Sequence, residues 1–275
     1  MRPKLILTDL DGTLLSRHRA VSPANLAALT RAAEGGAEIV VATGRYYGGM
    51  PRELRELPFL RYFILMNGAK VYDRQEDRIL YRAEIPLEQA EALFDYMWQQ
   101  DATVDCYQND RAYMDRRYYD RLDYYIHDPD SRELVRSIRT PVEDFRTRVR
   151  AGGDTVQKVQ SYFPHLEVRE RVMAYLEKEF PDLVLSISMP TNLEINHAGA
   201  TKGAALLALC EVLGVDVKDT AAFGDGTNDL SMIQTAGVGV AMANGAPEVL
   251  AAADRIAPPC EEDGVAQILN EWFPE

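Results

Sequence analysis

The chain has 275 residues, which suits one large domain or two domains of moderate size. Hydrophobic residues make up 47% and charged residues 27%, a composition that is typical of a globular protein and excludes a disordered chain. The formal net charge of -13 repels the phosphates of nucleic acid polymers and of membranes, so we exclude both as partners. A small anionic substrate stays compatible with this charge if a local cation or a bound metal reverses the field.

The cysteines and the N-terminal run indicate a compartment. Cys106, Cys210 and Cys260 are widely spaced, which argues against a disulfide framework and against a zinc site. The apolar run at the N-terminus meets Asp9 too early for a signal peptide or a membrane span. We therefore expect a cytoplasmic protein.

The first third of the chain alternates strand and helix patterns. Residues 5–7 and 38–42 predict strands, and residues 22–33 predict the helix between them. A third apolar run, residues 62–66, stops at Asn67 and Gly68, which together are a strong signal for a hairpin turn. Strands that alternate with helices predict a parallel sheet.

The last third of the chain again alternates strand and helix patterns. Helices predicted over residues 199–213 and 229–236 alternate with strands predicted over residues 220–223 and 238–241. The segment between the first and last thirds has a different composition, and its predicted strands are rich in tyrosine and in charged residues. We therefore expect an α/β fold in which a Rossmann-like parallel-sheet core is interrupted by an inserted α/β domain. The expected bounds are residues 1–82 and 191–275 for the core and 83–190 for the insertion.

Two carboxylates follow the first predicted strand. Asp9 and Asp11 are two positions apart, so an extended chain directs both to one side, at the edge where open α/β sheets bind ligands. One carboxylate can then act as nucleophile and metal ligand while the other acts as general acid and base. Taken alone, the pair is more typical of a solvated acidic turn after a strand. A calcium loop does not fit, because Ala20 stands where such a loop needs glutamate.

Three later segments carry further candidates. Thr43, Gly44 and Arg45 follow a strand, where a hydroxyl and backbone N–H groups can hold a phosphate, although a plain turn and a surface ion pair for the arginine also fit. Lys202 begins a helix, where the dipole disfavours a cation unless an anion lies nearby, although an exposed lysine costs little there. Residues 224–229 bring two more carboxylates to a strand end, and such oxygen ligands suit Mg²⁺ unless the segment is a structural loop.

Two other patterns favour structural roles. Residues 107–125 mix tyrosines with arginines, which can stack on a substrate but are more typical of half-buried packing. The four histidines have no metal-ligand spacing, so we assign none of them to a metal; they are His18, His127, His165 and His197.

The four chemical segments, in this order, resemble the haloacid dehalogenase-like superfamily. Residues 224–229 with Met232 are similar to its Cof-like phosphatase branch. Later signatures of that branch also resemble parts of this chain, namely Asn67–Gly68 and residues 241–244 and 262–265. Residues 192–199, which precede Lys202, match the branch only loosely.

The resemblance implies a magnesium-dependent phosphatase that acts on a small phosphorylated metabolite: a sugar phosphate, a phosphorylated cofactor or a nucleotide. It implies that Asp9 forms an aspartyl phosphate and that Asp11 is the general acid and base. Mg²⁺ is then held by Asp9, the backbone carbonyl of Asp11 and Asp225, with Asp229 as a further or supporting ligand.

By the same resemblance, Thr43 and Lys202 hold the transferring phosphoryl group as catalytic residues. Further contacts with substrate or phosphate are implied for Gly12, Gly44, Arg45, Asn67 and Asn228. The insertion resembles the cap that selects the substrate in this branch. Two alternatives stay open: a phosphotransferase or phosphomutase on the same core, and a non-catalytic sensor of a phosphorylated metabolite.

Overall fold

The computed structural model describes residues 2–15 and 20–274 and divides the chain into two compact units. One unit combines residues 1–82 with 201–275, and the other is residues 83–200. His18 lies outside the described residues.

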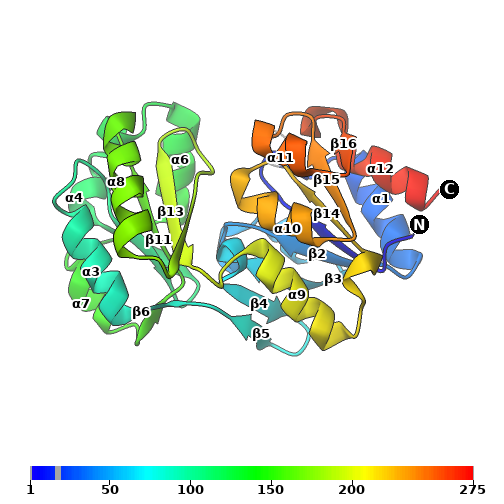
Figure 1. Ribbon diagram of the computed structural model, residues 1–275, viewed down its shortest axis with the longest axis horizontal. Coiled ribbons are helices and arrows are strands. Elements are labelled where there is room, and N and C mark those ends of the chain that lie inside the picture. The colour runs from blue at the N-terminus through cyan, green and yellow to red at the C-terminus, as the bar shows by residue number, and fades with distance from the viewer. Residues whose placement is uncertain (1, 16–19, 275) are drawn as a thin grey trace. The chain divides into compact units, whose positions relative to one another are not determined.

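The larger unit is built on an eight-stranded sheet (Figure 1). Six strands are parallel, and the last two continue the sheet in antiparallel fashion. In sheet order they are β16 (Arg255–Ala257), β15 (Val238–Met242), β14 (Thr220–Gly224), β1 (Leu5–Thr8), β2 (Glu38–Ala42), β3 (Leu60–Leu65), β4 (Lys70–Asp73) and β5 (Arg78–Arg82). The near-continuous apolar sequences of β1 and β2 follow from burial on both faces, as parallel sheets require.

Helices cover both faces of this sheet. One face packs on α9 (Lys202–Leu213), α10 (Leu230–Thr235) and α11 (Pro247–Ala252), which share a buried cluster with Leu5 and Val40. α1 (Pro23–Glu34) and α12 (Gly264–Trp272) pack against each other and against β2 and β16, respectively. The remaining short elements are η1 (Tyr47–Gly49), α2 (Arg52–Arg55), η2 (Met66–Gly68), η3 (Val217–Asp219), η4 (Thr227–Asp229) and η5 (Cys260–Glu262).

The smaller unit has a six-stranded sheet and a two-stranded ribbon. The sheet order is β12 (Leu183–Ser186), β13 (Asn192–His197), β11 (Lys158–Tyr162), β7 (Asp105–Gln108), β8 (Arg111–Asp115) and β9 (Thr140–Val142), and the ribbon pairs β6 (Ile85–Pro86) with β10 (Thr155–Val156). Its helices are α3 (Leu87–Met97), α4 (Arg116–Tyr119), α5 (Leu122–Tyr125), α6 (Pro129–Ile138), α7 (Phe145–Arg150) and α8 (Leu166–Glu179).

The tyrosines of residues 107–125 mostly serve packing. Tyr113, Tyr118 and Tyr125 are buried in the core of the smaller unit, whereas Tyr124 is 38% exposed. The guanidinium of Arg117 lies over the Tyr118 ring, at 4.6 Å from its centroid. These contacts support the packing interpretation of the segment.

The expected bounds differ from the structure at the return from the insertion. The sequence-based boundary at residue 190 precedes β13, yet β13 pairs with β11 and β12 inside the smaller unit. α9 also begins at Lys202 rather than at residue 199, because the Thr201 side chain accepts a hydrogen bond from the N–H of Ala204 and caps the helix there.

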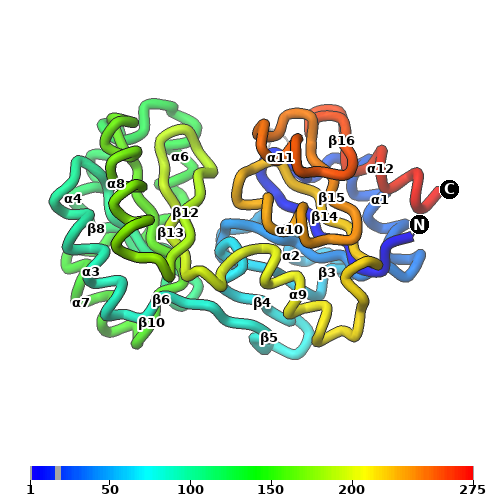
Figure 2. The backbone as a smooth tube through the Cα atoms, viewed as in Figure 1, coloured from blue at the N-terminus to red at the C-terminus, as the bar shows by residue number. Residues whose placement is uncertain are grey.

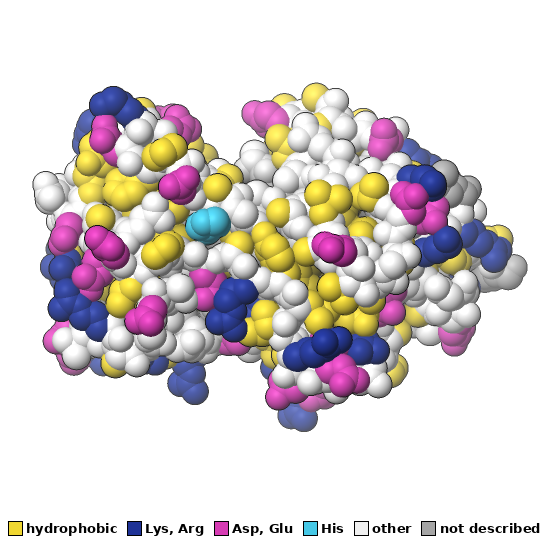
Figure 3. Space-filling model, turned by 60° about the horizontal axis from the view of Figure 1, so that its bottom comes forward, with side chains coloured by type: hydrophobic (Ala, Val, Ile, Leu, Met, Phe, Trp, Pro, Cys, Tyr) yellow, Lys and Arg dark blue, Asp and Glu magenta, His cyan; other side chains and the backbone are white. Residues whose placement is uncertain are grey.

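Both ends of the described chain lie in the larger unit (Figure 2), where Arg2 Nε donates to the carbonyl of Trp272 at 3.1 Å. On the face shown in Figure 3, acidic and basic side chains are interspersed with exposed hydrophobic ones. Among the described residues, no helix has the length and apolar character needed to cross a membrane.

Candidate active site

The candidate site lies at the carboxyl ends of neighbouring parallel strands in the larger unit. Asp9 follows β1, Thr43 follows β2, and Asp225 follows β14. β1 pairs with β2 on one side and β14 on the other, and the N–H of Asp9 donates to the carbonyl of Phe223 at 2.9 Å. The parallel register therefore brings together side chains that are far apart in the sequence.

Lys202 links two of the carboxylates. Its Nζ lies 2.6 Å from Asp9 Oδ1 and 2.5 Å from Asp229 Oδ1, and the lysine is fully buried. Burial alone would lower the pKa of Lys202, but the Asp229 and Asp9 carboxylates outweigh it, so the pKa of Lys202 is raised. The ammonium group therefore remains charged inside the site. Its place at the start of α9, which looked unfavourable for a cation, is explained by these two anions.

Asp229 also shapes the loop that carries Asp225. Asp229 Oδ2 accepts hydrogen bonds from the backbone N–H groups of Asp225 and Gly226, both at 2.9 Å. Since Asp229 Oδ1 already binds Lys202, both oxygens of this side chain have protein partners. Asp229 therefore fixes the lysine and the loop at the same time.

Asp225 is held against the chain that follows Asp9. Thr13 Oγ1 donates to Asp225 Oδ1 at 2.7 Å. A Cβ atom on Gly12 would lie 2.3 Å from Asp225 Oδ2, and Gly12 has a φ of +87°, so only glycine fits this close approach without strain.

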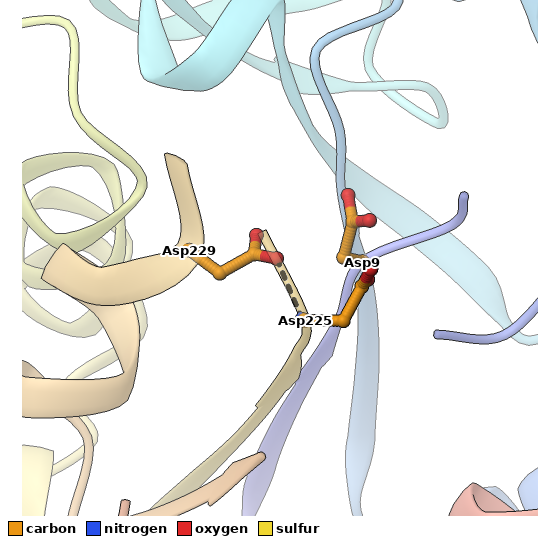
Figure 4. A group of neighbouring side chains, drawn as sticks. All are labelled: Asp9, Asp225 and Asp229. Carbon is orange, nitrogen blue, oxygen red and sulfur yellow. Dashed lines mark hydrogen bonds between the residues drawn. The ribbon is translucent and has the colours of Figure 1, made fainter. Parts of the chain in front are cut away.

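The three carboxylates form a compact acidic group (Figure 4). Each of Asp9, Asp225 and Asp229 offers an oxygen within 4.8 Å of the others. Burial and the neighbouring carboxylates raise the pKa of Asp9 well above its ordinary value despite Lys202, and burial and Asp229 raise the pKa of Asp225 to about 7. The single lysine therefore does not supply enough positive charge to keep all three carboxylates ionised. Clustered carboxylate oxygens of this kind fit a hard divalent cation such as Mg²⁺.

Asp11 lies at the more exposed side of the site and is bound by Arg45. Arg45 Nε donates to Asp11 Oδ2 at 2.8 Å, and Nη2 donates to Oδ1 at 2.5 Å. The side chain of Asp11 is 52% exposed, whereas that of Arg45 is 11% exposed. The sequence left an ion pair and a phosphate contact open for Arg45, and the structure contains the ion pair.

The remaining predicted site residues surround this group. Thr43 is buried, and its Oγ1 accepts a hydrogen bond from the N–H of Arg45 at 3.2 Å, immediately after Gly44. Asn228 Nδ2 donates to Asn67 Oδ1 at 3.1 Å, which connects the loop after β14 with the turn after β3. Asn67 and Gly68 have φ values of 62° and 106°, as the hairpin signal predicts.

Two contributors were not identified from the sequence. Thr13 belongs to the first acidic segment, and its contact with Asp225 spans 212 positions. Asn244 Nδ2 donates to the carbonyl of Gly12 at 2.8 Å, and Asn244 Oδ1 accepts from the N–H of Cys260 at 2.9 Å. The sequence features that could have identified them are the threonine after Asp-x-Asp-Gly and the asparagine at the end of residues 241–244.

Comparison with known proteins identifies related sequences. Residues 6–269 match the family described as haloacid dehalogenase-like hydrolase. YxeH of Bacillus subtilis (strain 168), which is named as a phosphatase without a stated substrate, is 31% identical over 98% of this chain and 97% of its own. An HMP-PP phosphatase of Yersinia pseudotuberculosis is 28% identical over 98% of this chain and 95% of its own.

Solved structures share the fold over nearly the full length. A haloacid dehalogenase-like hydrolase from B. subtilis has a TM-score of 0.84 and 28% identity, covering 97% of this chain and 99% of its own. One from Bacteroides thetaiotaomicron has a TM-score of 0.81 and 28% identity, covering 98% of this chain and 100% of its own. The likeness therefore includes both units.

Proposed function

The chain belongs to the haloacid dehalogenase-like hydrolases and is a phosphoric monoester hydrolase, and we propose that it dephosphorylates a small metabolite through a covalent phosphate on Asp9. The observation that carries this proposal is the contact between Asp9 and Lys202 at the sheet edge. A fixed cation beside a nucleophilic carboxylate offsets the repulsion between that carboxylate and an anionic phosphoryl group.

The reaction has two steps, and Asp11 serves both. In the first, a carboxylate oxygen of Asp9 attacks phosphorus, the bond to the ester oxygen breaks, and Asp11 gives its proton to that oxygen. In the second, Asp11 takes a proton from water, the water oxygen attacks phosphorus, and the bond to Asp9 breaks. Inorganic phosphate leaves, and both carboxylates return to their starting states.

Lys202 and Thr43 are the proposed contacts of the phosphoryl oxygens. The raised pKa of Lys202 keeps its charge, and the Thr43 hydroxyl lies on the neighbouring strand end. Such fixed donors stabilise charge as it develops on the transferring group. Gly12, Gly44, Asn67 and Asn228 are proposed to complete these contacts.

The acidic group is proposed to hold Mg²⁺ through Asp9, Asp225 and the backbone carbonyl of Asp11. When bound, Mg²⁺ would neutralise charge on the phosphoryl group. Asp229 is proposed as a supporting residue because Lys202 and two backbone N–H groups already engage its oxygens.

The smaller unit is proposed to select the substrate. Its sheet carries charged and polar side chains on one face, including Asp105, Tyr107, Lys158, Gln160 and Glu194, which neighbour one another in the strand register. These side chains are buried and bind one another or Arg139, so the selection of the substrate is proposed for the unit as a whole and not for these five residues. HMP-PP, the compound named for the Yersinia relative, therefore belongs in a substrate test beside sugar phosphates and nucleotides.

The test is phosphate release from that panel, with and without Mg²⁺. We expect Mg²⁺-dependent release from at least one compound and its loss in Asp9→Asn. Asp216→Asn, which changes an exposed carboxylate paired with Lys218, is the matched control and should stay active. Undiminished release by Asp9→Asn would contradict the nucleophile. Label passing from substrate to a second hydroxyl rather than to inorganic phosphate would favour a phosphotransferase.

A further inference from the structure

Arg45 donates two parallel hydrogen bonds to the carboxylate of Asp11. The Nε–Oδ2 and Nη2–Oδ1 distances are 2.8 and 2.5 Å, and the third guanidinium nitrogen, Nη1, donates to the carbonyl of Gly49 at 3.0 Å. A planar guanidinium bound in this way fixes the plane of a carboxylate as well as its position, which a lysine cannot do.

The segment that carries Arg45 is itself anchored. The N–H of Arg45 donates to Thr43 Oγ1, and its carbonyl accepts from the N–H of Met66 at 3.1 Å. The ring of Tyr47 packs edge-on against Phe63 and Tyr72, with centroid distances of 5.2 and 5.3 Å. These contacts hold η1 and therefore also the Gly49 carbonyl that steadies the guanidinium.

Asp11 needs such a partner more than Asp9 does. Asp9 is buried and bound by Lys202, whereas the Asp11 side chain is half exposed at the turn after β1. A half-exposed carboxylate explores several rotamers, and proton transfer requires one position within hydrogen-bond reach of the reacting oxygen.

We propose that Arg45 is a positioning residue that orients Asp11 for proton transfer, rather than a ligand of the phosphate. The inference rests on the proposed function of Asp11 as general acid and base. Each Asp11 oxygen keeps a second lone pair beyond its hydrogen bond to Arg45. The Asp11 carboxylate can therefore still exchange a proton with the leaving group or with water. A misplacement of about 1 Å costs about a hundredfold in rate at such a centre.

The test compares Arg45→Ala, Arg45→Lys, Asp11→Asn and the Arg45→Ala/Asp11→Asn double variant. Two substrates are used: glycerol 2-phosphate, whose leaving alkoxide needs a proton, and 4-nitrophenyl phosphate, whose leaving group needs it far less. Arg45→Ala should lower kcat on glycerol 2-phosphate by about ten- to a hundredfold with little change in KM. Its effect on 4-nitrophenyl phosphate should be smaller in the first step, and Arg45→Lys should recover only part of the loss.

The double variant decides the mechanism. If Arg45 acts through Asp11, Arg45→Ala should cause no further loss in the Asp11→Asn background. A full additional loss there, or a rise in KM with kcat unchanged, would overturn the inference while leaving the proposed function intact. Full activity of Asp11→Asn would instead overturn the acid–base role and the inference with it. Arg52→Ala removes an exposed arginine that pairs with Glu56 on the nearby α2, and it should behave like the unmodified protein.

Discussion

Lys202 Nζ lies between Asp9 Oδ1 and Asp229 Oδ1, at 2.6 and 2.5 Å, in a position with no exposed surface. The side chain comes from the start of α9, and the two carboxylates come from the ends of two adjacent strands and their following turns. A single cation therefore ties three segments of the larger unit together at the point where phosphate is proposed to bind.

Replacing Lys202 with methionine should abolish most of the activity. The change removes the charge that offsets repulsion between Asp9 and the phosphoryl group, so kcat/KM should fall about a hundredfold or more. It also leaves two buried carboxylates without their cation, which should lower the free energy of unfolding by about 3–5 kcal/mol. Steady-state kinetics and chemical denaturation measure the two effects. Lys218→Met removes an exposed lysine as control, and an active Lys202→Met enzyme would contradict the proposed role.

Thr13→Val should weaken the binding of Mg²⁺. The hydroxyl of Thr13 donates to Asp225 Oδ1, and its loss lets the carboxylate turn away from the proposed ligand position. Loss of such a supporting hydrogen bond weakens metal binding by about ten- to a hundredfold. Calorimetric titration with Mg²⁺ measures the change. Thr30→Val, on α1, is the matched control because its hydroxyl donates to the backbone carbonyl of Leu26 and not to a carboxylate of the acidic group. Unchanged affinity in Thr13→Val would contradict the assignment of Asp225.

Binding of Mg²⁺ should release protons near neutral pH. The pKa of Asp225 is raised to about 7 by burial and by Asp229, and that of Asp9 is raised as well, so the metal-free protein retains protons on this group. A cation favours the ionised carboxylates. The apparent affinity for Mg²⁺ should therefore be weaker below about pH 7 and should increase as the pH rises to that value. Titrations at about pH 6.5 in two buffers of different ionisation enthalpy measure the proton count. Equal heats in the two buffers would contradict this prediction.

Much of the larger unit's fold is predictable from local sequence. The apolar run of β2 and the Asn67–Gly68 turn encode a buried strand and a hairpin, because burial and positive φ restrict the residue types at these positions. The second boundary of the insertion is not encoded in this way. β13 joins the smaller unit by pairing with β11 and β12, and pairing partners cannot be identified from the strand's own residues.

The candidate site also has features that the local sequence predicts and features that it does not. Asp9, Asp11 and Asp225 follow strands, so their shared position at one edge of the sheet was predictable from the order of the elements. The Thr13–Asp225 contact depends on the parallel register of β1 and β14, which brings together residues 212 positions apart. The ion pair between Arg45 and Asp11 likewise depends on the path of η1, because the Gly49 carbonyl of η1 accepts a hydrogen bond from Arg45. The sequence has no periodic signal for that path.

Removing Arg139 should destabilise the smaller unit in a pH-dependent way. Arg139 and Asp105 form a fully buried ion pair, and Arg139 Nη2 also donates to Gln160 Oε1 at 3.0 Å. Arg139→Met leaves the Asp105 carboxylate buried without its cation, which should cost about 3–5 kcal/mol of unfolding free energy. Asp105→Leu combined with Arg139→Met removes the stranded charge and should recover part of that loss.

The sign of the pH effect follows from Asp105. Burial raises the pKa of this carboxyl in the folded protein even with Arg139 present, and loss of the arginine raises it further. A carboxyl with a raised folded pKa binds its proton more tightly in the folded than in the unfolded state, so stability falls as pH rises through that range. Arg139→Met should therefore be less destabilising at about pH 5 than at about pH 8. Denaturant unfolding of the single and double variants at both pH values measures this difference, and a pH-independent loss in Arg139→Met would show that the stranded Asp105 charge is not its cause.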